Sequence, residues 1–185
     1  MNRKRAVFFD KDGTLVPDIP YNCDPSRMEL VAGAGEALRC LAREGFELFV
    51  VSNQSGVARG HFAESALDGV TARMKELFDA AGVRLTGAFY CVHAPDGGCC
   101  CRRPQPGMLL RAAMQNDLCL PECWMVGDIL DDIEAGNAAG ARTVLVANGN
   151  EHEWVTGPRR VPDAIAGSVS EVGEVIRQCT RGLLR

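Results

Sequence analysis

The sequence lacks any apolar run long enough to cross a bilayer, which needs about 20 consecutive apolar residues. Near its start, only the apolar residues 6–9 separate a basic segment from Asp10, too few for the core of a secretory signal. No internal repeat and no low-complexity linker interrupts the chain. These absences predict a cytoplasmic protein without a membrane partner, folded as a single domain over residues 1–185.

An excess of positive charge is also missing. The chain has 20 Lys and Arg residues against 24 Asp and Glu, for a net charge of −4. Proteins whose main partner is a nucleic acid usually carry a basic surface, so that function is not expected. Nothing in the sequence calls for a protein partner either, and we expect a monomer.

Cysteine, in contrast, is abundant, with nine residues in 185. A reducing cytoplasm favours burial or metal binding over disulfides. Cys91, His93, Cys99 and Cys101 lie within one short Gly- and Pro-containing segment, and three sulfurs with one imidazole suit a tetrahedral structural Zn²⁺. Cys100 is expected to point away, although the alternative in which it replaces a neighbouring ligand stays open. Unligated buried cysteines or a redox pair are the other interpretations.

The hydrophobic pattern predicts an α/β fold. Apolar segments without polar alternation predict buried strands, and segments with a three- to four-residue period predict helices. The expected strands are 6–10, 46–53, 87–92, 123–128, 142–148 and 164–169, and the expected helices are 35–45, 67–81, 107–118, 130–139 and 170–179. This alternation is typical of a doubly wound, Rossmann-like parallel sheet with helices on both faces.

Polar residues follow several of these strands. Asp10, Ser52 and Asp128 each come at a strand end, where such sheets bind ligands, and Asp12 lies two residues after Asp10. Clustered carboxylates favour Mg²⁺, which would let one Asp attack a phosphate while another transfers protons. An EF-hand loop and a plain turn are the alternatives, but the twelfth position of an EF-hand loop would be Tyr21 instead of Glu.

A phosphate-binding segment is expected after the second strand. The Ser52 hydroxyl and the amides of residues 53–56 can surround an anion, and Arg59 can reach a second polar part of a ligand. Arg102 and Arg103 precede a predicted helix and can balance negative charge on a phosphate. A plain polar loop and a solvated arginine pair are the alternatives.

Together, "DKDGTLV", the Ser52-Asn53 strand end, Arg103-Pro104 and "GDILDD" resemble the four motifs of the haloacid dehalogenase superfamily of phosphatases. The resemblance implies an Asp10 nucleophile and an Asp12 general acid/base. It implies Mg²⁺ bound by Asp10, the Asp12 backbone carbonyl and Asp128, with Ser52 and Arg103 holding the phosphoryl group. The substrate contacts that it implies are Asn53, Gln54, Ser55, Arg59, Arg102, Asp18 and Tyr21.

More narrowly, "NQSGVARG" and "CVH…CCCRRPQPGM" resemble a capless subfamily that acts on heptose 1,7-bisphosphate, and related histidinol-phosphate phosphatases share the zinc loop. The substrate implied is thus a small phosphorylated sugar. This chain departs from the subfamily by Arg103 and Ile129 where Lys is usual, and by a shorter zinc loop. Histidinol phosphate or another small phosphate ester is the second hypothesis, and an inactive zinc-stabilised interaction module is the third.

Overall fold

The structure, a computed structural model, describes residues 4–182 of the chain, so the ends of the predicted 1–185 domain lie outside the described residues. The strands are β1 (Ala6–Asp10), β2 (Glu47–Asn53), β3 (Gly87–Cys91), β4 (Trp124–Gly127), β5 (Arg142–Val146) and β6 (Ala164–Ala166). The helices are α1 (Ala34–Arg43), α2 (Ala66–Ala80), α3 (Gly107–Asn116), α4 (Leu130–Ala139) and α5 (Val169–Thr180). Two short 3-10 helices are η1 (Pro25–Arg27) and η2 (Leu120–Glu122).

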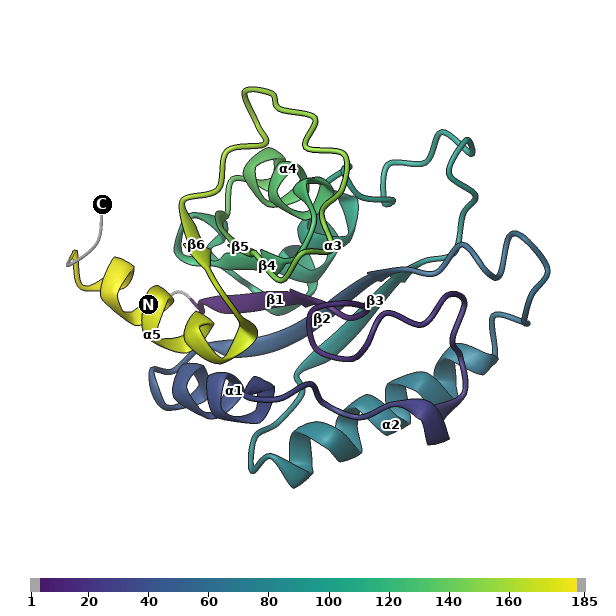
Figure 1. The fold of residues 1–185 in the computed structure, drawn as a ribbon, viewed down its shortest axis with the longest axis horizontal. Helices are drawn as coiled ribbons and strands as arrows, with labels where there is room; N and C mark the ends of the chain where they lie inside the picture. The colour runs from purple at the N-terminus through teal and green to yellow at the C-terminus, as the bar shows by residue number, and fades with distance from the viewer. Residues whose placement is uncertain (1–3, 183–185) are drawn as a thin grey trace.

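The strands form one parallel sheet in the order β3-β2-β1-β4-β5-β6 (Figure 1). The chain builds outward from β1 to β3 and then returns to place β4 on the other side of β1. The order therefore reverses beside β1, and parallel sheets bind ligands at such a reversal, beyond the carboxyl ends of the strands. The predicted doubly wound fold is confirmed. Within residues 4–182, no helix is both long and apolar enough for a membrane span.

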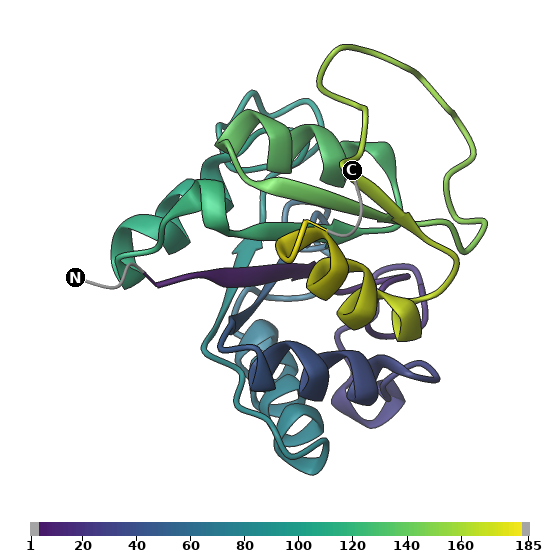
Figure 2. The same cartoon turned by 90° about the vertical axis from the view of Figure 1, so that its left-hand side faces the viewer.

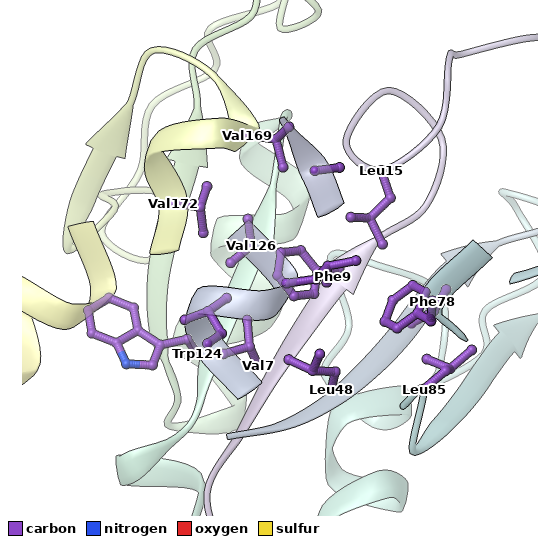
Figure 3. Close-up of a cluster of buried hydrophobic side chains, with 14 of the residues drawn as sticks. Val7, Phe9, Leu15, Leu48, Phe78, Leu85, Trp124, Val126, Val169 and Val172 are labelled. Atoms are coloured by element: carbon purple, nitrogen blue, oxygen red, sulfur yellow. The ribbon is translucent and has the colours of Figure 1, made fainter. Parts of the chain in front are cut away.

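Helices cover both faces of the sheet because successive side chains of a buried strand point to opposite faces. In β1, Val7 and Phe9 join a core cluster with α1, α2 and α5, whereas Ala6 and Phe8 join a second cluster with α3. Figure 2 shows the sheet between these two helical layers. The first cluster is seen at close range in Figure 3, which labels Val7, Phe9, Leu15, Leu48, Phe78, Leu85, Trp124, Val126, Val169 and Val172.

The predicted last strand, 164–169, is wrong at its end. β6 stops at Ala166, and α5 begins at Val169. The side chain of Glu171 accepts the amide of Gly167 at 2.9 Å, so this amide bonds to the first turn of α5 instead of to a neighbouring strand. The other elements agree with the prediction within three residues at either end, and the two 3-10 helices were not predicted.

The connections at the carboxyl edge hold no further domain. Between β1 and α1, residues 11–33 contain only η1, and residues 54–65 and 92–106 form irregular loops. The described part of the chain is thus capless, as predicted, and its carboxyl edge is bordered by loops.

Candidate active site

Two carboxylates meet at the reversal of strand order. Asp10 ends β1 and Asp128 directly follows β4, the strand paired with β1, so both side chains lie at the same edge of the sheet. They are 4% exposed each, and their oxygens lie within 4.8 Å of one another and of Asp132. The predicted pair Asp10 and Asp128 is therefore brought together, and the sequence analysis missed the third member.

Arg103, in the loop between β3 and α3, binds two of these carboxylates. Its guanidinium, 5% exposed, forms ion pairs with Asp10 through Nη2 and with Asp132 through Nη1. Its Nε atom is buried without a hydrogen-bond partner among the described residues. Since an arginine presents donors in a rigid fork, it fixes the relative position of the two acids.

The pKa values of these three acids are raised, so Arg103 alone does not compensate their negative charge. Burial raises the pKa of Asp10 well above its usual 3.8, Arg103 partly offsets this, and Asp132 and Asp128 raise it again. Burial raises the pKa of Asp128, and it raises that of Asp132 to about 7. A divalent cation would relieve this, and carboxylate oxygens are the ligands that Mg²⁺ prefers. The donor set therefore fits the predicted metal.

Asp128 is held at both of its oxygens. Thr14 donates its hydroxyl to Oδ1 at 3.2 Å, and Asn150 donates its amide to Oδ2 at 2.6 Å. Gly13 has a φ of 85°, and a Cβ there would lie 2.2 Å from Asp128 Oδ2. Only glycine therefore lets the turn after β1 approach this carboxylate so closely. Asn148 stabilises the same turn by donating its side-chain amide to the Gly13 carbonyl at 2.7 Å.

Asp12, two residues after Asp10, is contacted from the end of β2 and the residue that follows it. Gln54 Nε2 and Ser52 Oγ donate to Asp12 Oδ2 at 3.0 and 3.3 Å, and Gln54 also donates to Ser52 at 2.8 Å. The other oxygen, Oδ1, forms an ion pair with the side chain of Lys11. The structure thus unites the two predicted residues Asp12 and Ser52 and adds Lys11 to them.

A pocket of about 150 Å³ opens beside Asp12. It is lined by Asp12, Asp18, Ile19, Tyr21, Asn22, Asn53, Gln54, Ser55 and Gly56. Five predicted substrate contacts therefore share one pocket. Tyr21 stacks on His61 with ring centroids 4.2 Å apart, and the Arg59 guanidinium lies 5.9 Å from the Tyr21 ring. Arg59 thus reaches this pocket through Tyr21.

Arg102 lies elsewhere, in a second pocket of about 370 Å³. Its lining is Pro95, Gly98, Cys99, Arg102, Arg103, Pro104, Gln105 and Asp131. One Arg102 nitrogen, Nη1, is buried without a hydrogen-bond partner in the described part of the chain. The two pockets are linked through Asn53, whose amide bonds the Arg103 carbonyl at 3.3 Å and whose oxygen accepts the Arg103 amide at 3.1 Å.

The candidate zinc site is formed by the four predicted residues. Cys91, at the end of β3, lies 3.5 Å from His93 Nδ1 and 3.6 Å from Cys99, sulfur to sulfur. Cys101 lies 3.2 Å from both Cys91 and His93 and 3.5 Å from Cys99. A tetrahedral zinc with sulfur bonds of about 2.3 Å holds its ligands roughly 3.5–3.8 Å apart, close to these values. Cys100 is exposed and outside the cluster.

Without a bound cation, the thiols in this cluster shift one another's pKa values. Burial raises the pKa of Cys101 to about 12, as do the neighbouring thiols of Cys91 and Cys99. Burial also raises the pKa of Cys99, but the amides of Arg102 and Cys101 outweigh it and lower the value to about 6. Since zinc binds thiolates, this donor set fits Zn²⁺.

Replacing Cys99 with serine is expected to lower the zinc content of the purified protein from about one equivalent to near zero. Because the loop leads directly into Arg102 and Arg103, we expect kcat/KM to fall about tenfold, the effect of a disturbed supporting residue. Metal analysis and phosphate release measure the two effects. Cys100→Ser is the matched control and should keep its zinc. Active wild-type protein without zinc would contradict the assignment.

Several side chains at the site were not predicted from the sequence, among them Asp132, Lys11 and Asn150. Asp132 is the third residue of α4, and its side chain accepts the amide of Ile129, the residue before the helix, so an acid near the start of the predicted helix at 130 was the available signal. Lys11 lies between two acids, where alternation along a strand would turn it away from them. Asn150 is 22 residues from its partner and has no local signal.

Comparisons with known proteins agree with this geometry. A family model described as HAD-hydrolase-like matches residues 100–172. The chain is 39% identical over 166 residues to the D-glycero-beta-D-manno-heptose-1,7-bisphosphate 7-phosphatase of Escherichia coli (strain K12), covering 81% of this chain and 87% of that one. It is 33% identical over 160 residues to the Helicobacter pylori protein of the same name, covering 84% and 92%.

Solved structures are also similar. The D,D-heptose 1,7-bisphosphate phosphatase of B. bronchiseptica, solved with magnesium and phosphate, has a TM-score of 0.78 and 27% identity, covering 97% of this chain and 99% of that one. A putative HAD-like phosphatase from Mesorhizobium loti has a TM-score of 0.81 and 32% identity, covering 99% and 88%. The similarity thus extends over nearly the whole described fold.

Proposed function

Because this chain belongs to the haloacid dehalogenase-like hydrolases, in the family of the heptose-1,7-bisphosphate 7-phosphatases, we propose that it removes the 7-phosphate of D-glycero-D-manno-heptose 1,7-bisphosphate. One observation carries the proposal. Asp10 is buried at the strand-order reversal, paired with Arg103 and next to Asp128, and Asp12, two residues later, lines the adjoining pocket. This arrangement supports phosphoryl transfer to an aspartate.

In the proposed reaction, an Asp10 oxygen attacks phosphorus, and the bond between phosphorus and the substrate's C7 oxygen breaks. Asp12, which must carry a proton when this step begins, gives that proton to the departing oxygen. Asp12 then takes a proton from water, the water oxygen attacks phosphorus, and inorganic phosphate leaves with Asp10 restored. Ser52 and Arg103 hold the transferring phosphoryl group, and Arg103 also keeps Asp10 in line.

We assign Mg²⁺ to Asp10, the Asp12 backbone carbonyl and Asp128. When bound, it neutralises the charge that would keep a carboxylate from approaching a phosphate. Asp128 is oriented for this by Thr14 and Asn150. Zn²⁺ at Cys91, His93, Cys99 and Cys101 has a structural role, because protein ligands fill all four positions.

The rest of the substrate would occupy the pocket beside Asp12. Asp18, Tyr21, Asn53, Gln54 and Ser55 line it and can donate to and accept from sugar hydroxyls. Arg59, beside Tyr21, and Arg102, in the second pocket, are the two cations available to bind the second phosphate. In the absence of a cap domain, these loops alone would select the substrate.

We propose a single domain acting as a monomer in the cytoplasm, without nucleic-acid or membrane partners. The one six-stranded sheet of the described residues supports the single domain, and the net charge of −4 supports the absence of a nucleic-acid partner. A size-exclusion measurement that gives a dimer mass would overturn the monomer.

Side-by-side kinetics test the substrate. With Mg²⁺ present, we expect kcat/KM for heptose 1,7-bisphosphate to exceed that for histidinol phosphate by about 10²-fold or more, because two polar subsites serve only a bisphosphate. Phosphate release is the readout. Equal values would favour the second hypothesis, and no turnover on a broad panel of phosphate esters would favour the inactive interaction module.

A further inference from the structure

Lys11 is a fully buried charged side chain next to the candidate catalytic residues. Its side chain is 0% exposed, and its Nζ forms an ion pair with Asp12 Oδ1. Burying an ammonium costs several kcal/mol unless a partner compensates it. The carboxylate of Asp12 provides that compensation, so the two side chains hold each other in place.

The backbone around the pair is fixed by a closed turn. The Lys11 carbonyl accepts the amides of Leu15 and Val16, each at 3.0 Å, and the Gly13 amide donates to the Val16 carbonyl at 2.8 Å. Both members of the ion pair therefore start from a constrained backbone. An unconstrained surface pair contributes little, since its long side chains lose entropy, but this penalty is smaller where the backbone and the burial already restrict them.

The Asp12 carboxylate is consequently held from two directions. Lys11 binds Oδ1, whereas Gln54 and Ser52 donate to Oδ2. The Asp12 side chain is still 24% exposed and lines the pocket, so one side of it stays open to a ligand. Without the ammonium, only the two donors from β2 and its loop would restrain a partly exposed carboxylate.

We propose that Lys11 is a positioning residue that orients Asp12 for proton transfer to the leaving oxygen. The inference rests on the proposed function, in which Asp12 is the general acid. Lys11 itself touches neither substrate nor metal, so its removal should impair only the step that needs an oriented Asp12.

The leaving group provides a readout that a merely structural role would not change. Benzyl alcohol leaves as a strongly basic alkoxide and needs a proton, phenol needs it less, and p-nitrophenolate is a weak base that leaves unaided. The three phosphate esters carry the same aromatic ring, so their binding is closely matched. The constant kcat/KM covers the steps up to departure of the leaving group.

For Lys11→Met, we expect kcat/KM to fall about 10²-fold on benzyl phosphate and under about threefold on p-nitrophenyl phosphate, with phenyl phosphate between. Lys11→Arg keeps the cation and should restore most of the loss on benzyl phosphate. An equal loss on all three esters, or no loss on any, would overturn the proposal.

Two further measurements keep the outcomes separate. Circular dichroism checks folding, and Lys11→Gln replaces the methionine variant if that variant does not fold. If neither folds, Lys11 serves the fold and the positioning role is refuted. Asp10→Asn is measured on the same esters, because turnover by that variant would refute the proposed function independently of Lys11.

Discussion

Replacing Asp10 with asparagine is expected to lower kcat/KM on the physiological substrate by at least about 10⁴-fold, as losing a nucleophile does in other covalent mechanisms. Asparagine keeps the shape of the side chain and can still accept from Arg103. It carries no anionic oxygen for attack on phosphorus, however, and it is a weaker metal ligand. Phosphate release under saturating Mg²⁺ is the measurement.

The covalent step distinguishes the role of Asp10 as nucleophile from its role as a metal ligand. Acid-quenched wild-type protein should carry phosphate on Asp10 after brief exposure to substrate, and the variant should carry none at any Mg²⁺ concentration. Mass spectrometry of the intact chain reads this directly. Asp79→Asn, an exposed carboxylate on α2, is the matched control and should retain wild-type turnover. Full activity in Asp10→Asn would mean that the nucleophile is wrongly assigned.

Replacing Arg103 with methionine is expected to lower the free energy of unfolding by about 3–5 kcal/mol, because it leaves buried carboxylates without their ion-pair partner. Asp10 and Asp132 both lose the guanidinium. Activity should fall with stability, since Asp10 is no longer held in line and the phosphoryl group loses a cation. Denaturant unfolding and phosphate release measure the two effects.

The loss of stability should depend on pH. The folded-state pKa values of Asp10 and Asp132 lie above the usual 3.8, and that of Asp132 is about 7, so folding favours their protonated forms. Stability from such groups is present at low pH and is lost as pH rises through the folded pKa. Without Arg103 both pKa values should rise further. In metal-free protein, the difference between variant and wild type should therefore grow from pH 4 toward pH 8.

Two matched variants complete this test. Arg103→Lys keeps the positive charge and should retain most of the stability, with a smaller loss of rate, because lysine cannot bind both acids through a rigid fork. Arg177→Met removes a partly exposed arginine paired with Glu174, and its effect on stability should be far smaller than that of Arg103→Met. A comparable loss in Arg103→Met and Arg177→Met would refute the role of the buried network.

The zinc loop illustrates how much local sequence can predict. One Cys-x-His spacing (Cys91 and His93) and one Cys-x-Cys spacing (Cys99 and Cys101) lie within eleven residues. The candidate ligands therefore follow from the spacing within one short segment. The strands and helices were also predicted from periodicity, because hydrophobic burial acts on each element separately. The end of β6 was missed, since the Gly167 amide bonds to the side chain of Glu171 on α5, a contact that the apolar pattern of 164–169 does not indicate.

The sequence by itself determined the alternation of strands and helices, the carboxylates at strand ends and the four metal-binding candidates of the loop. Tertiary structure alone decided which charges meet. Arg103 reaches Asp10 across 93 residues, Asn150 reaches Asp128 across 22, and Lys11 turns toward Asp12 instead of away. The physical reason is that burial and pairing depend on where the sheet brings distant segments together, which no local pattern encodes.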